Sequence, residues 1–322
     1  MAELKKTVIV IISLLAVVIL GCATAPTIKK SGELGQKLIL AAKLGDIPVV
    51  MNLLDKGADQ NAVNQVGRTP LMYLCRTGNI EAVGRLINMG VDVNTANLEG
   101  HTAIMYASME GSENIVRLLI KKGADVNARS KQGTTALMLA AEFGRTNAAR
   151  ILIANGARVN AAKNCGQTAL MIAASYGQKE VLDLLLNAGA NIESQDQWGM
   201  TALLYAAQNS KDEVIKDLIK AGANVNECQY DGRTPLMLAA CCAKESTLAL
   251  LLGRGANPNI QDEGYNTALI LAADKGNAGK VVLLLQHGAD PDITDDHRKT
   301  ALDIARDREN KQVIKIIENA IH

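Results

Sequence analysis

Residues 133–141 read Gly-Thr-Thr-Ala-Leu-Met-Leu-Ala-Ala, and residues 123–127 read Gly-Ala-Asp-Val-Asn. A threonine at a helix start can accept a hydrogen bond from a free backbone amide, so Thr135 is expected to cap a helix that begins at Ala136. Glycine tolerates the left-handed conformation found after many helices, so Gly123 is expected to end the helix before it. The two segments therefore predict a helix, a polar loop and a second helix.

The same pattern recurs along the chain at a constant step of 33 residues, with no insertion. The threonines are Thr69, Thr102, Thr135, Thr168, Thr201, Thr234, Thr267 and Thr300. The glycines are Gly57, Gly90, Gly123, Gly156, Gly189, Gly222, Gly255 and Gly288. A fixed period of this length indicates a solenoid, in which each unit buries its apolar face only against its neighbours.

Each period predicts two helices. Counted from the threonine as zero, small and apolar residues at +2, +5, +6 and +9 form a narrow stripe along an inner helix: Leu137, Ala140, Ala141 and Gly144. Positions +13, +14, +17 and +18 form the apolar face of an outer helix, as in Ile115, Val116, Leu119 and Ile120. Residues 36–54 repeat this pattern before the first threonine motif, so nine helix pairs are expected. The last pair carries Asp303 where other repeats have Met or Leu, and we expect it to be a polar terminal cap.

These motifs resemble those of the ankyrin-repeat family along residues 34–322. The resemblance implies an all-α ankyrin-repeat solenoid of about nine stacked helix-turn-helix units joined by hairpin loops. It also implies a non-enzymatic scaffold that binds a protein partner in its concave groove.

The first residues of the chain have the layout of an export signal. Lys5 and Lys6 precede an uncharged apolar run over residues 7–20, which as a helix would reach only about 21 Å, against about 30 Å of membrane hydrocarbon. The following Gly21-Cys22 resembles the lipobox of bacterial lipoproteins, although Leu20 replaces the commoner Ala or Ser. The resemblance implies a signal peptide over residues 1–21 and a lipid on Cys22, with residues 22–33 as a flexible tether. Ala23 follows the cysteine where lipoproteins retained in the inner membrane often carry Asp, so the same resemblance implies the outer membrane, facing the periplasm. An ordinary signal peptide or a plain N-terminal anchor are the alternatives.

Composition excludes several classes of function. Lys and Arg number 34 against 33 Asp and Glu, so no bulk charge selects nucleic acid. No phosphate-binding Gly-rich loop, His-Glu-x-x-His or Gly-x-Ser-x-Gly motif occurs, and the four histidines do not converge. We therefore expect no catalytic residue, cofactor, metal or small-molecule substrate, and a monomer.

Positions that vary between repeats are free of the common packing constraint and are the candidates for partner binding. They lie in the hairpins and at +7 and +8 of the inner helices, and the protein-binding candidates among them are Arg68, Met109, Lys131, Phe143, Tyr176, Trp198 and Tyr230. The aromatic candidates are favoured because buried aromatics commonly anchor interfaces. By contrast, Tyr73, Tyr106 and Tyr205 at +4 are expected to pack between inner helices. The first four hairpin windows carry a net charge of +3 and the next four −6, which could orient an elongated partner.

Three other functions remain open at this point. Adjacent Cys241 and Cys242 could serve a thiol- or metal-dependent protein that protects the envelope from oxidants, whereas Cys75, at a core position, is expected to be structural. The chain could instead be a translocated effector that binds host proteins. It could also be a structural spacer, for which changes in the groove would have no effect.

Overall fold

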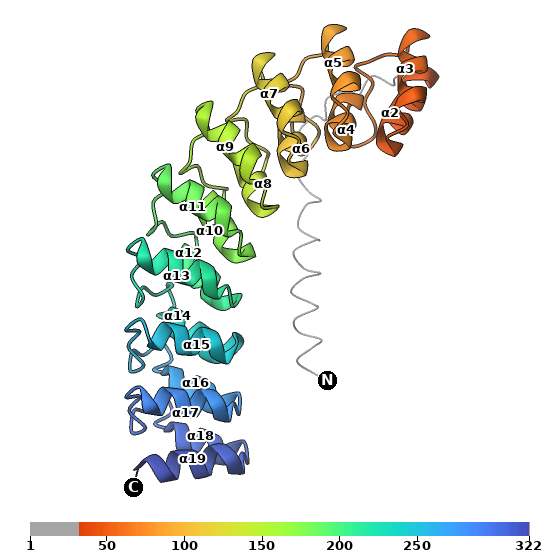
Figure 1. Cartoon of the computed structure of the whole chain (residues 1–322). Helices are drawn as coiled ribbons and strands as arrows, with labels where there is room; N and C mark the ends of the chain where they lie inside the picture. Colours follow the sequence, from red (N-terminus) through yellow and green to blue (C-terminus); the bar gives the residue numbers. More distant parts are fainter. Residues whose placement is uncertain (1–31, 322) are drawn as a thin grey trace.

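The computed structural model describes residues 32–321, and this part of the chain is folded into eighteen α-helices without a strand. The helices form nine antiparallel pairs stacked in chain order, which confirms the predicted all-α repeat architecture (Figure 1). The proposed signal peptide, the proposed lipid site at Cys22 and almost all of the proposed tether lie outside the described residues. None of the described helices is both long and apolar enough to cross a membrane.

The inner helices contact one another along the whole stack. They are α2 (Glu33–Leu44), α4 (Pro70–Thr77), α6 (Ala103–Glu110), α8 (Ala136–Glu142), α10 (Ala169–Tyr176), α12 (Ala202–Gln208), α14 (Pro235–Cys242), α16 (Ala268–Asp274) and α18 (Ala301–Asp307). Each inner helix is followed by an outer helix that packs against it. The outer helices are α3 (Ile47–Asp55), α5 (Ile80–Asn88), α7 (Glu113–Lys121), α9 (Thr146–Ala154), α11 (Lys179–Asn187), α13 (Asp212–Lys220), α15 (Glu245–Leu252), α17 (Ala278–Gln286) and α19 (Lys311–Ile321).

The repeated threonines begin the inner helices as predicted. Thr135 has extended backbone angles, and its hydroxyl accepts a hydrogen bond from the Met138 amide at 3.3 Å. Pro70 and Pro235 occupy the first helical position, where the missing N–H costs nothing. Thr102 is the exception among these threonines, because its buried hydroxyl oxygen has no hydrogen-bond partner.

The inner helices end one or two residues before the last position of the predicted stripe. Gly144 was expected to belong to the apolar face of α8, but α8 ends at Glu142 and Gly144 has a φ of 65°. Gly111 and Gly177 occupy the same position in their repeats, and each is the left-handed residue after the inner helix. The glycine at +9 therefore ends the helix and is not part of its packing stripe.

The predicted apolar faces form the core. Leu137, Ala140 and Ala141 of α8 are buried, as are Ile115, Val116 and Leu119 of α7, whereas Ile120 is half-buried. Tyr73 and Tyr106 are also buried and Tyr205 is half-buried, as expected of position +4. Each tyrosine hydroxyl is hydrogen-bonded to a hairpin residue: Asn64 at 2.9 Å, Asn97 at 3.0 Å and Asp196 at 2.6 Å respectively.

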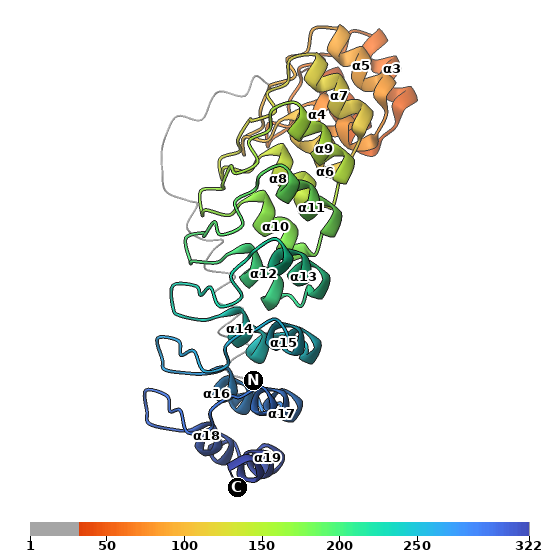
Figure 2. The same ribbon diagram turned by 60° about the vertical axis from the view of Figure 1, so that its left-hand side comes forward.

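The stack is curved, and its inner helices lie on the concave side of the arc (Figure 1). Consecutive inner helices contact each other more extensively than consecutive outer helices do, which accounts for the curvature. The hairpin loops all project from the same side of the stack (Figure 2). Adjacent hairpins are joined by backbone hydrogen bonds, as from Lys131 N to Glu99 O at 2.9 Å. Asn127 adds a second link, because its side chain donates to Gly156 O and accepts from Arg158 N.

Candidate functional site

Phe143 and Tyr176 are two exposed aromatic residues at the ends of adjacent inner helices. Phe143 directly follows α8 and Tyr176 is the last residue of α10, and their exposed fractions are 43% and 54%. The Tyr176 hydroxyl donates a hydrogen bond to Glu142 at 3.3 Å. The Glu142 carboxylate raises the pKa of Tyr176, so at neutral pH the hydroxyl remains a donor.

Trp198 and Tyr230 are two further exposed aromatic residues, on adjacent hairpins. Their exposed fractions are 54% and 63%, and the Tyr230 amide donates to the Trp198 carbonyl at 3.1 Å. The next hairpin carries Tyr265, which is 58% exposed and has a φ of 58°. Sequence reasoning missed Tyr265, although an aromatic residue in a variable hairpin was the signal that selected its two neighbours. Of the four predicted aromatics, two thus lie at inner-helix ends and two on hairpins.

Arg68 and Met109 are brought together in a cavity of about 280 Å³ between hairpins and inner helices. His101 and Tyr106 also line it, and the Arg68 guanidinium carbon lies 5.4 Å from the centre of the Tyr106 ring. The cavity also contains Glu99, whose Oε2 is 3.3 Å from His101 Nδ1. At this distance the two groups form an ion pair if His101 is protonated. Their geometry does not meet the criteria for a hydrogen bond, so the buried Nδ1 atom has no hydrogen-bond partner.

Lys131 lies apart from this cavity. Its side chain is exposed at the tip of a hairpin, and among the described residues its ammonium group has no ion-pair partner within 4.0 Å. Lys131 belongs to the basic half of the hairpin edge, whereas Trp198, Tyr230 and Tyr265 belong to its acidic half. The projecting edge therefore differs in both charge and aromatic content along the stack.

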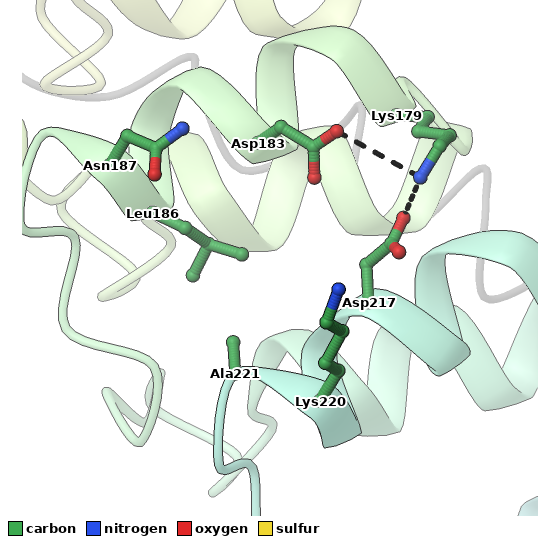
Figure 3. Close-up of a pocket in the computed structure, with 7 residues that line it drawn as sticks. All are labelled: Lys179, Asp183, Leu186, Asn187, Asp217, Lys220 and Ala221. Atoms are coloured by element: carbon green, nitrogen blue, oxygen red, sulfur yellow. Dashed lines mark hydrogen bonds and ion pairs between the residues drawn. The ribbon is translucent and has the colours of Figure 1, made fainter.

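A larger cleft of about 480 Å³ lies between the outer helices α11 and α13 (Figure 3). Lys179 is hydrogen-bonded there to Asp217 and lies 3.8 Å from Asp183. The hydrogen bond to Asp217 raises the pKa of Lys179, so the ammonium group remains charged and is compensated within the cleft. Since these charges pair with each other on the outer-helix surface, the cleft is a weaker candidate for a binding site than the concave face.

The cysteines give little support for thiol chemistry. In residues 32–321 all five cysteines are free, and Cys75 is buried as predicted. Cys242 is the last residue of α14 and is exposed as a whole. Its sulfur is nevertheless partly buried, and this burial, together with the neighbouring Cys241 thiol, raises the pKa of the Cys242 thiol. A raised pKa reduces the reactive thiolate at neutral pH.

One cluster has the side chains of a metal site. Asp295, Asp296 and His297 each bring one possible ligand atom to within 4.8 Å of the others. However, Asp296 and His297 are exposed, and the Asp295 carboxylate accepts backbone amides of His297 and Lys299 within its own hairpin turn. The cluster is explained by this turn without a metal ion.

The stacked helix pairs, the left-handed helix ends and the projecting hairpins define a solenoid repeat protein. A family model of ankyrin repeats (3 copies) matches residues 38–130, 128–196 and 179–262, and a second model of ankyrin repeats (many copies) matches residues 250–305. The chain therefore belongs to the ankyrin-repeat family. Ankyrin repeats are generally protein–protein interaction modules. Comparison with curated proteins gives no match.

Proposed function

We propose that this chain is a non-enzymatic scaffold that binds a protein partner on its concave face and hairpin edge. The observation that carries the proposal is the placement of Phe143, Tyr176, Trp198 and Tyr230, which are all exposed on inner-helix ends or hairpins. Within the described residues, no aromatic side chain lies on an outer helix. Exposed aromatics with few rotatable bonds gain contact area at a low entropy cost, as interface anchors do.

The rigidity of the scaffold supports the same proposal. Adjacent hairpins are joined by backbone hydrogen bonds, so the residues they present are fixed before a partner arrives. A preorganised surface loses little conformational entropy on binding. The charge difference between the two halves of the hairpin edge would favour one orientation of an elongated partner.

The experiment that tests this function is cross-linking in intact cells, comparing the native chain with a variant that combines Phe143→Ala, Tyr176→Ala and Trp198→Ala. The proposal expects the variant to fold normally and to lose the partner. Equal capture by the two chains would contradict it and would favour a structural spacer.

We further propose that the scaffold is an exported lipoprotein, attached through Cys22 to the periplasmic face of the outer membrane. The proposal is supported by the sequence of residues 5–22, with its basic start, apolar run and Gly-Cys ending. Metabolic labelling with a palmitate analogue should label the native chain and not Cys22→Ala, and membrane fractionation should follow the label. Recovery of unlabelled native protein outside the producing cells would instead favour the translocated effector.

A thiol-dependent function makes a separable prediction. Replacing Cys241 and Cys242 together by serine should leave partner capture unchanged if the concave face carries the function. Loss of oxidant protection in that variant, with capture intact, would establish the thiol alternative.

A further inference from the structure

The cavity beside Arg68 differs from the rest of the concave face because it places a fixed cation above an apolar floor. It is lined by Arg68 and His101 from the hairpin edge, by Met105, Tyr106 and Met109 of α6, and by Leu139 of α8. Its volume of about 280 Å³ is just below the roughly 300–1,000 Å³ of typical small-ligand pockets. The size is better suited to one or two side chains of a partner than to a cofactor.

The Arg68 guanidinium is held in place by aromatic rings. Its central carbon lies 5.4 Å from the ring centre of Tyr106 and 6.0 Å from that of Tyr73. These rings are themselves fixed, because both side chains are buried and their hydroxyls accept hydrogen bonds from Asn97 and Asn64. The cation is therefore preorganised within the cavity.

Arg68 also lacks a partner of opposite charge. Its Nε is buried and makes no hydrogen bond, and no carboxylate among the described residues lies within 4.0 Å of its guanidinium. Glu99, the acidic residue of the cavity, is 61% exposed and lies beside His101. A partly desolvated guanidinium without a counter-ion favours a carboxylate, which it can bind by two parallel hydrogen bonds.

The floor of the cavity adds an apolar preference. Met105 is fully buried, and Met109 and Leu139 are half-buried around the opening. Methionine side chains adapt to apolar groups of different shape. A carboxylate that is followed or preceded by an apolar side chain would satisfy both the guanidinium and the floor.

We propose that this cavity binds an Asp or Glu side chain of the protein partner, within an acidic and apolar peptide segment that lies along the concave face. This inference rests on the proposed function, because it names the chemistry of the segment that the scaffold recognises. The charge of the hairpin edge supports the assignment. The half of the edge that contains Arg68 carries +3 and the other half −6, so an acidic segment is attracted to the first half and repelled by the second.

The test uses the full chain purified in detergent and random 12-residue peptides displayed on phage. The proposal expects selection of peptides with Asp or Glu next to an apolar residue. For a synthetic copy of a selected peptide, Arg68→Gln should weaken binding at least tenfold. Arg117→Gln, which removes an exposed cation of the outer helix α7, away from the cavity and the hairpin edge, should change the affinity by less than twofold.

A second peptide, identical except that its Glu is replaced by Gln, tests whether the Glu carboxylate pairs with Arg68. Replacing the peptide Glu by Gln should cost at least tenfold with the native chain and less than twofold with Arg68→Gln. If Arg68→Gln does not fold, Met109→Glu places a carboxylate at the cavity and should abolish binding by itself.

The inference would be overturned by any of three results: selection of neutral or basic peptides, no enrichment of any peptide, or equal binding of the selected peptide to the native chain and to Arg68→Gln. If the selected peptide is lost by the Phe143, Tyr176 and Trp198 triple variant but retained by Arg68→Gln, the proposed function stands and only the carboxylate site fails. If neither variant changes the binding of the selected peptide, both the proposed function and the carboxylate site are contradicted.

Discussion

The Nζ atom of Lys280 lies 2.9 Å from the carbonyl oxygen of Ala240, across the boundary between two repeats. Lys280 belongs to the outer helix α17, is only 4% exposed, and also donates to Ala239 O at 2.9 Å. These carbonyls lie near the C-terminal end of α14. Its capping residue Ala243 has a φ of −93°, where other inner helices are followed by a left-handed residue. The lysine therefore supplies hydrogen bonds at a helix end that lacks the usual turn.

Lys280→Met is predicted to destabilise the chain by about 1.5–3 kcal/mol, since two buried carbonyls would lose a charged donor. The free energy of unfolding from urea denaturation, followed by circular dichroism, measures the change. Lys275→Met is the control, because Lys275 is about half exposed and its removal should cost no more than about 0.5 kcal/mol. Equal stabilities for the two variants would show that the Lys280 bonds do not matter.

Gly156 and Gly199 have similar positive φ angles, but replacing them by alanine should reduce stability to different extents. Gly156 has a φ of 84° with open space around the missing side chain, so Gly156→Ala should cost about 1–2 kcal/mol from the left-handed conformation alone. At Gly199 a Cβ would lie 2.6 Å from Tyr230 N, so Gly199→Ala should cost more and should also displace the Trp198–Tyr230 pair. The melting temperatures of the two variants rank their stabilities. If Gly199→Ala is as stable as Gly156→Ala or more stable, the hairpins are not closely packed at Gly199.

The terminal repeat should show a pH-dependent contribution from Asp303. Hydrogen bonds from the Thr300 hydroxyl and amide lower the pKa of the Asp303 carboxyl below its usual value of 3.8. Because the pKa is lowered on folding, the stabilisation is present above the unfolded pKa and is lost as pH falls through the folded pKa. Asp303→Asn should therefore be less stable than the native chain at pH 6, by about 0.3–1 kcal/mol, and this difference should shrink as the pH falls below 3.8. Urea denaturation at a series of pH values from 6 downwards checks this, and a difference that does not change with pH would exclude the carboxylate as its cause.

Sequence periodicity predicted the fold in detail because every repeat satisfies the same packing constraint. The threonine caps, the nine helix pairs and the burial of Cys75 all follow from local rules. The role of Gly144 was assigned wrongly, because a small residue at helical spacing is compatible with either a packing stripe or a left-handed helix end. Lys280 was not anticipated, since its partners are about 40 residues away in the sequence.

The candidate site could be predicted only in part. Variable positions identified the exposed aromatics and divided them between inner-helix ends and hairpins, but the backbone hydrogen bond that joins the hairpins of Trp198 and Tyr230 depends on the three-dimensional stacking. The Arg68 cavity likewise requires residues from two hairpins and three inner helices. Periodicity shows which positions are free to vary and does not show which of them share a cavity.

The most direct test of partner binding is quantitative mass spectrometry of proteins cross-linked to the tagged chain in intact cells. The native chain is compared with the variant combining Phe143→Ala, Tyr176→Ala and Trp198→Ala. A second variant, Val49→Ala with Ile80→Ala, removes apolar residues of similar exposure from the outer helices α3 and α5. We expect the aromatic variant to melt within a few degrees of the native chain and to capture its partner at least tenfold less, while the outer-helix variant captures it fully. Equal capture by all three chains, or unfolding of the aromatic variant, would contradict the assignment of these residues to partner binding.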